Sequence, residues 1–449
     1  GVECEPGCVA AARASPAACA DVLGCVRRVE LRPPAGRWAG EVPLGALASL
    51  TGLRALDLPC RRATGSLDAL AGAQGLTSLT LDAGGLSGSL EGLRGLTFLE
   101  ELDLSALPPG APGARDCAAG GGRAGGPPSA AWAWARRNPP DQGYSHRFDL
   151  SILGPGGGLA GDLAPLAALE QLRVLRVEGT EIGGNLSAVA SLPFLEELHV
   201  GGNCLGGGLG PLEGLSALRE VTIPAKYPWS RLQPDPASVW TNSYALYDRP
   251  CNGSGGLDGG LGAVSGLRGL EVLDLSYNAL EGNISAVENL TLLTELALNE
   301  NLIGGNISSV HNLSGLTFLG VGGYPSEYYN SSADDWGPPE ALEGNLSEVS
   351  HLTNLTHLDV SESRVGGEIG SLRELTDLAF LNLAWAYYVE GRGYSDDDLA
   401  AVGRMVKLRF LAMNAFEKDV AVPLKRLTSL THLSLRGLDA PGLGRLTSL

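Results

Sequence analysis

Three features are missing from this 449-residue sequence, and each absence excludes a class of protein. No apolar run approaches the roughly 18 residues that a membrane-spanning helix needs, so we expect no membrane span in this segment. No run of basic residues is present and the net charge is −18, which argues against a nucleic-acid partner. No CxxC pair, metal-ligand histidine spacing, nucleophile–base pair or glycine-rich phosphate loop stands out. We therefore predict no enzyme, no cofactor and no metal site.

The sequence contains instead an internal repeat of 23 residues. Residues 267–289 read LRGLEVLDLSYNALEGNISAVEN and residues 290–312 read LTLLTELALNENLIGGNISSVHN. Residues 169–191 and 352–374 have the same frame, LxxLxxLxLxxNxLxGNLSxVxx, and we number its positions 1 to 23 from the first leucine. The LxL part alternates with period two, which predicts a short strand. One turn cannot bury its own leucines, so the turns must stack into a solenoid.

This repeat resembles the plant-type leucine-rich-repeat (LRR) family, whose unit is LxxLxxLxLxxNxLxGxIP. Serine stands in place of the family's proline at Ser187, Ser285, Ser308 and Ser347, and the asparagine of the ladder is kept at Asn203, Asn278 and Asn301. The resemblance implies a right-handed, curved solenoid with one parallel sheet on its concave side and little helix. We expect about 14 turns over residues 26–449, preceded by a cysteine-bearing cap over residues 1–25. The resemblance also implies a binding scaffold, such as a receptor ectodomain or a wall-associated protein.

Eight cysteines suggest disulfide bonds and an oxidising compartment. We predict the pairs Cys60–Cys117 and Cys204–Cys251, because each joins a residue just after a strand to a long inserted segment. The four remaining cysteines are expected to pair within the cap: Cys4, Cys8, Cys19 and Cys25.

Nine Asn-x-Ser/Thr sequons predict N-glycosylation in a secretory protein. They are Asn185, Asn252, Asn283, Asn289, Asn306, Asn312, Asn330, Asn345 and Asn354. Four of them share position 17 and two share position 23, which places them in columns on the exterior of stacked turns. The alternative is that the GNLS segment is a turn in which the asparagine bonds its own backbone.

Four segments lengthen individual turns just after the strand, near residues 106–158, 224–256, 323–341 and 385–400. Six of the seven tryptophans and ten of the eleven tyrosines lie in them. Tryptophan and tyrosine dominate interface hot spots, so these side chains either form a contact surface or pack the insertions onto the solenoid. The candidate binding residues are Trp132, Trp134, Trp229, Trp240, Tyr328, Tyr329, Trp336 and Trp385.

The concave positions 6, 8 and 10 carry mostly acids, with Arg176 and Arg436 as the basic residues. The acids are Asp57, Asp82, Glu101, Asp103, Glu178, Glu197, Glu220, Asp274, Glu295 and Asp359. Paired carboxylates can serve as general acids or calcium ligands, whereas a solvated acidic face is the simpler interpretation. Position 6 of the later turns carries rings instead, which form a second candidate contact patch: Phe318, His357, Phe380, Phe410 and His432.

Together these features predict a non-catalytic glycoprotein outside the cell or on its surface. We expect it to bind other proteins or copies of itself, with a structural subunit of a cell-surface or extracellular-matrix assembly as the preferred interpretation. The alternatives are a ligand-binding receptor ectodomain and a carbohydrate-binding surface protein. Because the chain begins at Gly1, we expect that a signal peptide has been removed. Because Leu446 and Leu449 open a new turn, we expect more chain or another molecule to cover that end.

Overall fold

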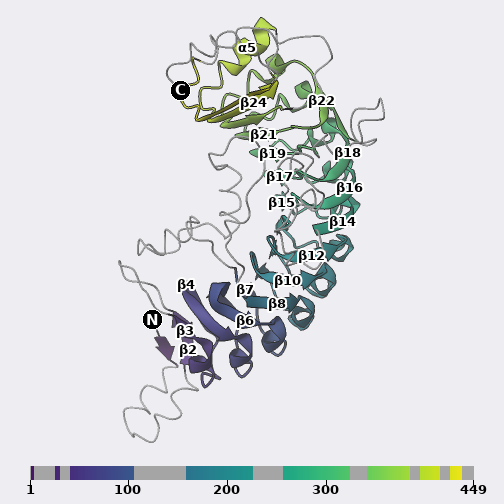
Figure 1. Cartoon of the computed structure of the whole chain (residues 1–449). Helices are drawn as coiled ribbons and strands as arrows, with labels where there is room; N and C mark the ends of the chain where they lie inside the picture. The colour runs from purple at the N-terminus through teal and green to yellow at the C-terminus, as the bar shows by residue number, and fades with distance from the viewer. Residues whose placement is uncertain are drawn as a thin grey trace, which may run out of the picture. The chain divides into compact units, whose positions relative to one another are not determined.

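The computed structural model describes residues 2–4, 26–30, 41–105, 158–225, 256–323, 341–384, 395–414 and 425–436. These residues fall into two compact units, with the boundary between Leu257 and Asp258. Each unit is built from the same repeated turn, and successive turns follow one another along the chain (Figure 1).

Each turn contributes its LxL segment to a parallel ladder of strands, which we call the first ladder. In unit 1 the first ladder consists of β2 (Val26–Glu30), the start of β4 (Ala55–Ser66), β5 (Ser78–Asp82), β7 (Glu101–Asp103), β9 (Val174–Arg176), β11 (Glu197–His199) and β13 (Glu220–Thr222). In unit 2 it consists of β15 (Val272–Asp274), β17 (Glu295–Ala297), β19 (Phe318–Gly320), β21 (His357–Asp359), β23 (Phe380–Asn382), β24 (Phe410–Asn414) and β25 (His432–Arg436). The sequence predicted these strands.

A second parallel ladder runs through positions 13 to 17 of the turns. The sequence predicted the first ladder but not this one. Its strands in unit 1 are β3 (Val42–Pro43), the end of β4, β6 (Leu86–Gly88), β8 (Gly158–Asp162), β10 (Glu181–Gly184) and β12 (Cys204–Gly207). Strand β14 (Gly256–Gly260) contains the unit boundary, and unit 2 continues with β16 (Ala279–Asn283), β18 (Leu302–Asn306), β20 (Leu342–Asn345) and β22 (Arg364–Gly366).

A 3-10 segment of three to six residues follows each strand of the second ladder. These segments are η3 (Leu44–Leu47), η4 (Leu67–Leu70), η6 (Leu90–Leu93), η8 (Ala164–Ala168), η9 (Leu186–Ser191), η10 (Gly210–Leu212), η13 (Leu261–Val264), η14 (Ile284–Val287), η15 (Ile307–Val310), η17 (Leu346–Val349) and η18 (Ile369–Leu372). One more, η5 (Ala83–Gly85), connects β5 to β6. Little helix was expected, and α5 (Asp396–Val402) is the only α-helix in the described ranges.

Helix α5 begins in a segment, near residues 385–400, that the sequence marked as an insertion, and it ends just beyond that segment. Ser395 caps it: the hydroxyl accepts from the Asp398 amide, and the Asp398 carboxylate accepts in return from the Ser395 amide. Asp398 also accepts a hydrogen bond of 2.7 Å from the Gly370 amide in η18, which docks the helix on the neighbouring turn. The Ser-x-x-Asp pattern is a helix-start signal, so this element was readable from the sequence.

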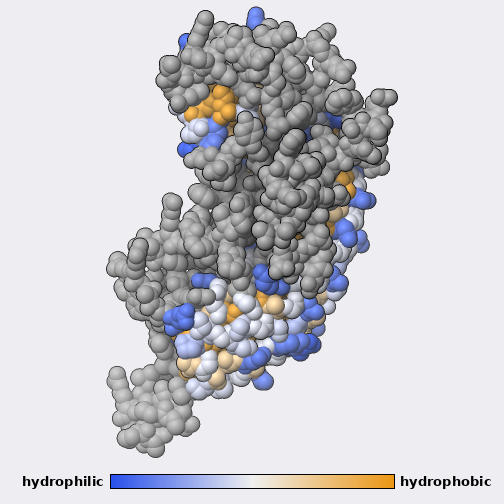
Figure 2. Space-filling view, viewed as in Figure 1, coloured by the Kyte–Doolittle hydropathy of each residue, from blue (hydrophilic) through white to orange (hydrophobic). Residues whose placement is uncertain are grey.

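The core is made of the repeated leucines, stacked in constant register. Along the first ladder of unit 2, each leucine pairs with the equivalent leucine of the next strand, in the order Leu273, Leu296, Leu319 and Leu358. All four are fully buried. On the face shown in Figure 2, the described surface is mostly white to blue with small orange areas, because the leucines point inward.

The asparagines of position 12 form the predicted ladder between turns. Asn301 is 3% exposed, and its Nδ2 donates to the carbonyls of Leu298 (3.0 Å) in its own turn and Leu275 (2.9 Å) in the preceding turn. Its Oδ1 accepts from the Leu280 amide at 3.0 Å. Ser363 occupies the same position in a later turn and bonds within its own turn: its hydroxyl donates to the Val360 carbonyl (2.6 Å) and accepts from the Val365 amide (3.2 Å).

Glycine at position 16 lets consecutive turns approach closely. Gly367 has a φ of +105°, and a Cβ there would lie 2.5 Å from Oδ1 of Asn345 in the turn before. Any side chain at this point would therefore be strained and would displace the asparagine.

The expected N-terminal cap lies mostly outside the described residues. Its first strand, β1 (Val2–Cys4), pairs antiparallel with β2 and so covers the outer edge of the first ladder.

Candidate functional site

The first ladder of unit 1 carries a charged cluster on the face turned away from the leucine core. The register places Glu197 beside Glu220, and it places Asp103, Arg176 and His199 in one column. Arg176 forms an ion pair with Glu197, and its guanidinium lies 4.0 Å from the carboxylate of Asp103. The constant register of the turns therefore gathers residues that are far apart in sequence.

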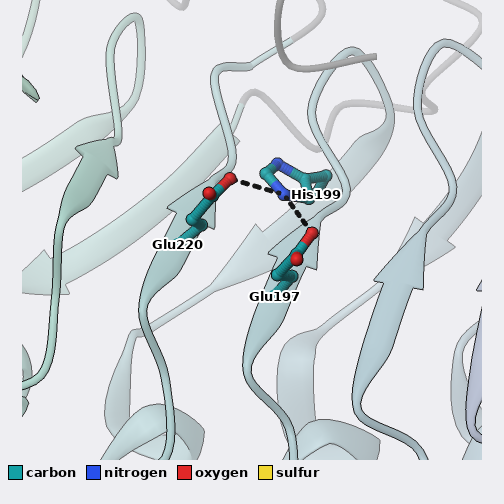
Figure 3. Close-up of side chains that lie close together, drawn as sticks. All are labelled: Glu197, His199 and Glu220. Atoms are coloured by element: carbon teal, nitrogen blue, oxygen red, sulfur yellow. Dashed lines mark ion pairs between the residues drawn. The ribbon is translucent and has the colours of Figure 1, made fainter. Parts of the chain in front are cut away.

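His199 lies at the centre of this cluster and is fully buried. Its Nε2 lies 3.3 Å from Oε2 of Glu220 and 3.6 Å from Oε2 of Glu197 (Figure 3). Burial acts to lower the pKa of His199, but its contacts with Glu197 and Glu220, together with the charge of Glu178, raise that pKa to about 9. The imidazole therefore exists as a cation between the two carboxylates at neutral pH.

The surroundings of His199 also shift the pKa values of two neighbouring carboxylates, Asp103 and Glu197. Burial raises the pKa of Asp103 despite hydrogen bonds from Ser105, whereas the contact with His199 and the charge of Arg176 lower the pKa of Glu197. Glu178 is 2% exposed and accepts from the Ser105 hydroxyl at 3.5 Å. When His199 is neutral, the carboxylates of the cluster outnumber its one guanidinium, so the cluster favours an added positive charge.

Glu197, His199 and Glu220 each offer one ligand atom, and these atoms lie within 4.8 Å of one another. A metal ion could thus be held here, although sequence spacing predicted none. His199 was missed because its partner Glu220 lies on the next turn, in the column of Glu197. A comparison 23 residues apart finds the pair Glu197 and Glu220, and His199 stands two residues after Glu197. The imidazole of His199 is fully buried, so a substrate could reach this cluster only through the partly exposed carboxylates of Glu197 and Glu220.

The interpretation of positions 6, 8 and 10 as a solvated acidic face is wrong for several acids. Asp274 is 1% exposed and Asp359 is 8% exposed. The Asp359 carboxylate accepts from both the amide and the hydroxyl of Ser361, and Asp274 does the same with Ser276. These aspartates close the turn after the strand, as short polar side chains often do.

The rings predicted at position 6 form a continuous column in unit 2. The ring centroids of His357 lie 4.0 Å from Phe318 and 3.9 Å from Phe380, and those of Phe380 and Phe410 lie 4.3 Å apart. His432 ends the column, 6.2 Å from Phe410. The first three rings are buried, whereas Phe410 and His432 are half-buried and offer ring surface to a partner.

All seven sequon asparagines in the described ranges are exposed. They are Asn185, Asn283, Asn289, Asn306, Asn312, Asn345 and Asn354. The four at position 17 also cap the 3-10 segments, because each Oδ1 accepts a 2.9 Å hydrogen bond from the serine amide two residues later. The turn interpretation therefore holds, and it is compatible with glycosylation, since the cap uses Oδ1 and a glycan is attached to Nδ2.

Several predicted residues fall outside the described ranges. These are all eight candidate binding residues in the insertions, the sequons Asn252 and Asn330, and the cysteines Cys8, Cys19, Cys25, Cys117 and Cys251. Cys60 lies within β4 and not after a strand. Cys204 opens β12 and is disulfide-bonded, while its pairing with Cys251 stays a prediction.

Comparison with solved structures supports the fold. A TDR receptor superposes with a TM-score of 0.58 and 19% identity, over 94% of this chain and 57% of that chain. The PEPR1–AtPEP1 structure gives 0.59 and 18%, over 97% and 53%, and an internalin from Listeria monocytogenes gives 0.56 and 17%, over 93% and 89%. The chain thus has the leucine-rich-repeat fold and spans little more than half of the first two proteins. No family model and no curated protein matches the sequence.

Among the described residues, no helix has the length and apolar character that crossing a membrane requires.

Proposed function

We propose that this chain is an extracellular, N-glycosylated protein that binds protein partners or copies of itself and has no catalytic role. The observation that carries the proposal is the distribution of the sequons. All those in the described ranges are exposed, and none lies on a strand of the first ladder. Glycans on the return path of the turns would shield that surface, so a partner would meet the first ladder or the turns next to it.

The half-buried rings of Phe410 and His432 are the contact that we propose in unit 2. Large rings supply contact area at a low cost in side-chain entropy, which is why they recur in interface hot spots. Trp229 and Trp336 lie outside the described residues and follow strands of the first ladder in sequence, and we propose that they too contact a partner. Because the rings replace acids on the later turns, unit 2 is the better candidate for an apolar partner surface.

A secreted preparation tests the proposal in two measurements. Glycopeptide mass spectrometry should find N-glycans at Asn283, Asn306 and Asn345. Analytical ultracentrifugation and cross-linking of natural material should detect an assembly that Phe410→Ala or Trp336→Ala weakens by about 2 kcal/mol, or roughly 30-fold.

Phe194→Ala is the matched control, because Phe194 is 53% exposed and lies at position 3, outside the first ladder. Secreted protein without any glycan, or an assembly that all three variants weaken equally, would contradict the proposal. Lower thermal stability with unchanged assembly would show that the rings serve only to pack the turns.

The preferred form of this function is a structural subunit of a cell-surface or matrix assembly. A receptor ectodomain is the second candidate, and the likeness to the TDR receptor favours it at the level of the fold. The full-length gene distinguishes the two: a membrane helix with a kinase-like tail supports the receptor, and further repeats without an anchor support the structural subunit.

A further inference from the structure

The cluster around His199 has hydrogen-bonding groups that the protein itself does not satisfy. Neither Nδ1 of His199 nor the Thr222 hydroxyl has a hydrogen-bond partner among the described residues, and Nε2 of His199 forms ion pairs with Glu220 and Glu197 but no hydrogen bond. Thr222 is 1% exposed and is the register partner of His199 on the neighbouring strand β13. Buried polar groups without partners are rare in folded proteins, and an unseen ion or water is a common reason for them.

The distances in the cluster suit ligands of a common ion better than hydrogen-bonded partners. Nε2 of His199 lies 3.3 Å and 3.6 Å from the carboxylate oxygens of Glu220 and Glu197. Hydrogen bonds from N–H to oxygen measure about 2.7–3.2 Å. Two ligands bound tetrahedrally to zinc at about 2.0–2.2 Å are separated by roughly 3.3–3.6 Å.

The ligand types and the charge of the cluster agree with these distances. One imidazole and two carboxylates are ligands that Zn²⁺ accepts, with water in the fourth position. The side chains of Glu197 and Glu220 are 27% and 28% exposed, which leaves them room to adjust and leaves the ion a route of entry. Arg176 contacts the same carboxylate oxygen of Glu197, Oε2, that faces His199, and would orient that carboxylate as an outer-shell partner.

The geometry points to a site for a divalent transition-metal ion, with Zn²⁺ as the best fit, held by Glu197, His199 and Glu220. The ion would join β11 to β13, two adjacent strands of the first ladder in unit 1. It would therefore stabilise the stacking of two turns just before the insertion that follows β13. This site is independent of the proposed function, because it requires no partner protein.

Direct metal binding to the whole chain tests the site. Protein stripped with a chelator should take up one Zn²⁺ per chain from a micromolar solution, measured by calorimetry and by elemental analysis after dialysis. The same site should give Co²⁺ the intense visible absorption of tetrahedral coordination. Zn²⁺ should also raise the melting temperature of the wild-type protein.

Two variants and one control make the result decisive. His199→Gln and Glu220→Gln should each weaken Zn²⁺ binding by on the order of 100-fold and abolish the Co²⁺ spectrum. Glu220→Gln is isosteric and only partly buried, so it answers the question even if His199→Gln fails to fold. Glu295→Gln is the matched control, because Glu295 holds the same repeat position 6 on β17 in unit 2, with Ala297 where unit 1 has His199.

Each remaining outcome overturns the proposal. Wild-type protein that takes up no stoichiometric Zn²⁺ would show that a proton on His199 alone balances the two carboxylates. Uptake that Glu220→Gln retains in full would show adventitious binding elsewhere on the acidic surface.

Discussion

The asparagine ladder gives the sharpest prediction for stability. Asn301→Ala removes the bonds to the carbonyls of Leu275 and Leu298 and the bond from the Leu280 amide. A buried hydrogen bond contributes about 0.5–1.5 kcal/mol net, so the three together should lower the free energy of unfolding by about 3 kcal/mol. Asn301→Ser should cost about 2 kcal/mol, because Ser363 shows that a serine at this position keeps the bond within its own turn.

Two measurements check this reasoning on unglycosylated protein. Urea denaturation gives the free energies, and hydrogen exchange should show faster exchange of the Leu280 amide in both variants. Asn306→Ala is the control: it removes one exposed cap, to the Ser308 amide, and should cost about 1 kcal/mol. A serine variant no more stable than the alanine variant, or an alanine variant within about 0.5 kcal/mol of wild type, would refute the ladder as the link between turns.

Three further predictions follow from the core, the glycines and the charged cluster. Leu275 is fully buried, so Leu275→Ala should cost about 2–5 kcal/mol in urea denaturation, and a loss below about 1 kcal/mol would mean that the core can collapse around the cavity. Gly367→Ala should cost more than about 1 kcal/mol because of its positive φ and its contact with Asn345, whereas Gly262→Ala, with open space around it, should cost less; equal losses would contradict the close-approach argument. In metal-free protein, the folded state raises the pKa of His199 from 6.5 to about 9, so the charged imidazole stabilises the fold. This stabilisation is complete below pH 6.5 and is lost as the pH rises through about 9. It amounts to ~3 kcal/mol. Denaturation curves from pH 6 to 9.5 should show that loss in wild type and not in His199→Gln. A wild-type stability that rises with pH over this range would contradict a raised pKa for His199.

The repeat predicted the first ladder, its register and its buried leucines, because those positions alternate and recur every 23 residues. It did not predict the second ladder. Strands such as Leu302–Asn306 are rich in glycine and carry no alternating apolar pattern, so hydrophobic periodicity cannot detect them. What defines them is the pairing of each turn with its neighbours, which the sequence of a single turn does not display.

Of the candidate sites, too, the sequence predicted some features and not others. The ring column from Phe318 to His432 was predicted, because phenylalanine or histidine recurs at the same repeat position of successive turns. The position-17 asparagines were noticed as sequons, while their capping role needed the backbone geometry of the 3-10 segments. The cluster of His199 with Glu197 and Glu220 was missed because its members differ in type and lie on two turns.

The constant register of the first ladder has a consequence for how such a chain can change in length. Leu273, Leu296 and Leu319 occupy one column, so excision of residues 290–312 would bring the first and third of them together with the same pairing. Excision of any fraction of a turn would instead move a leucine out of the column and a polar side chain into it. Gene duplication or deletion in steps of whole turns is therefore compatible with folding, and the number of turns is free to vary between related chains while the interior of each turn is not.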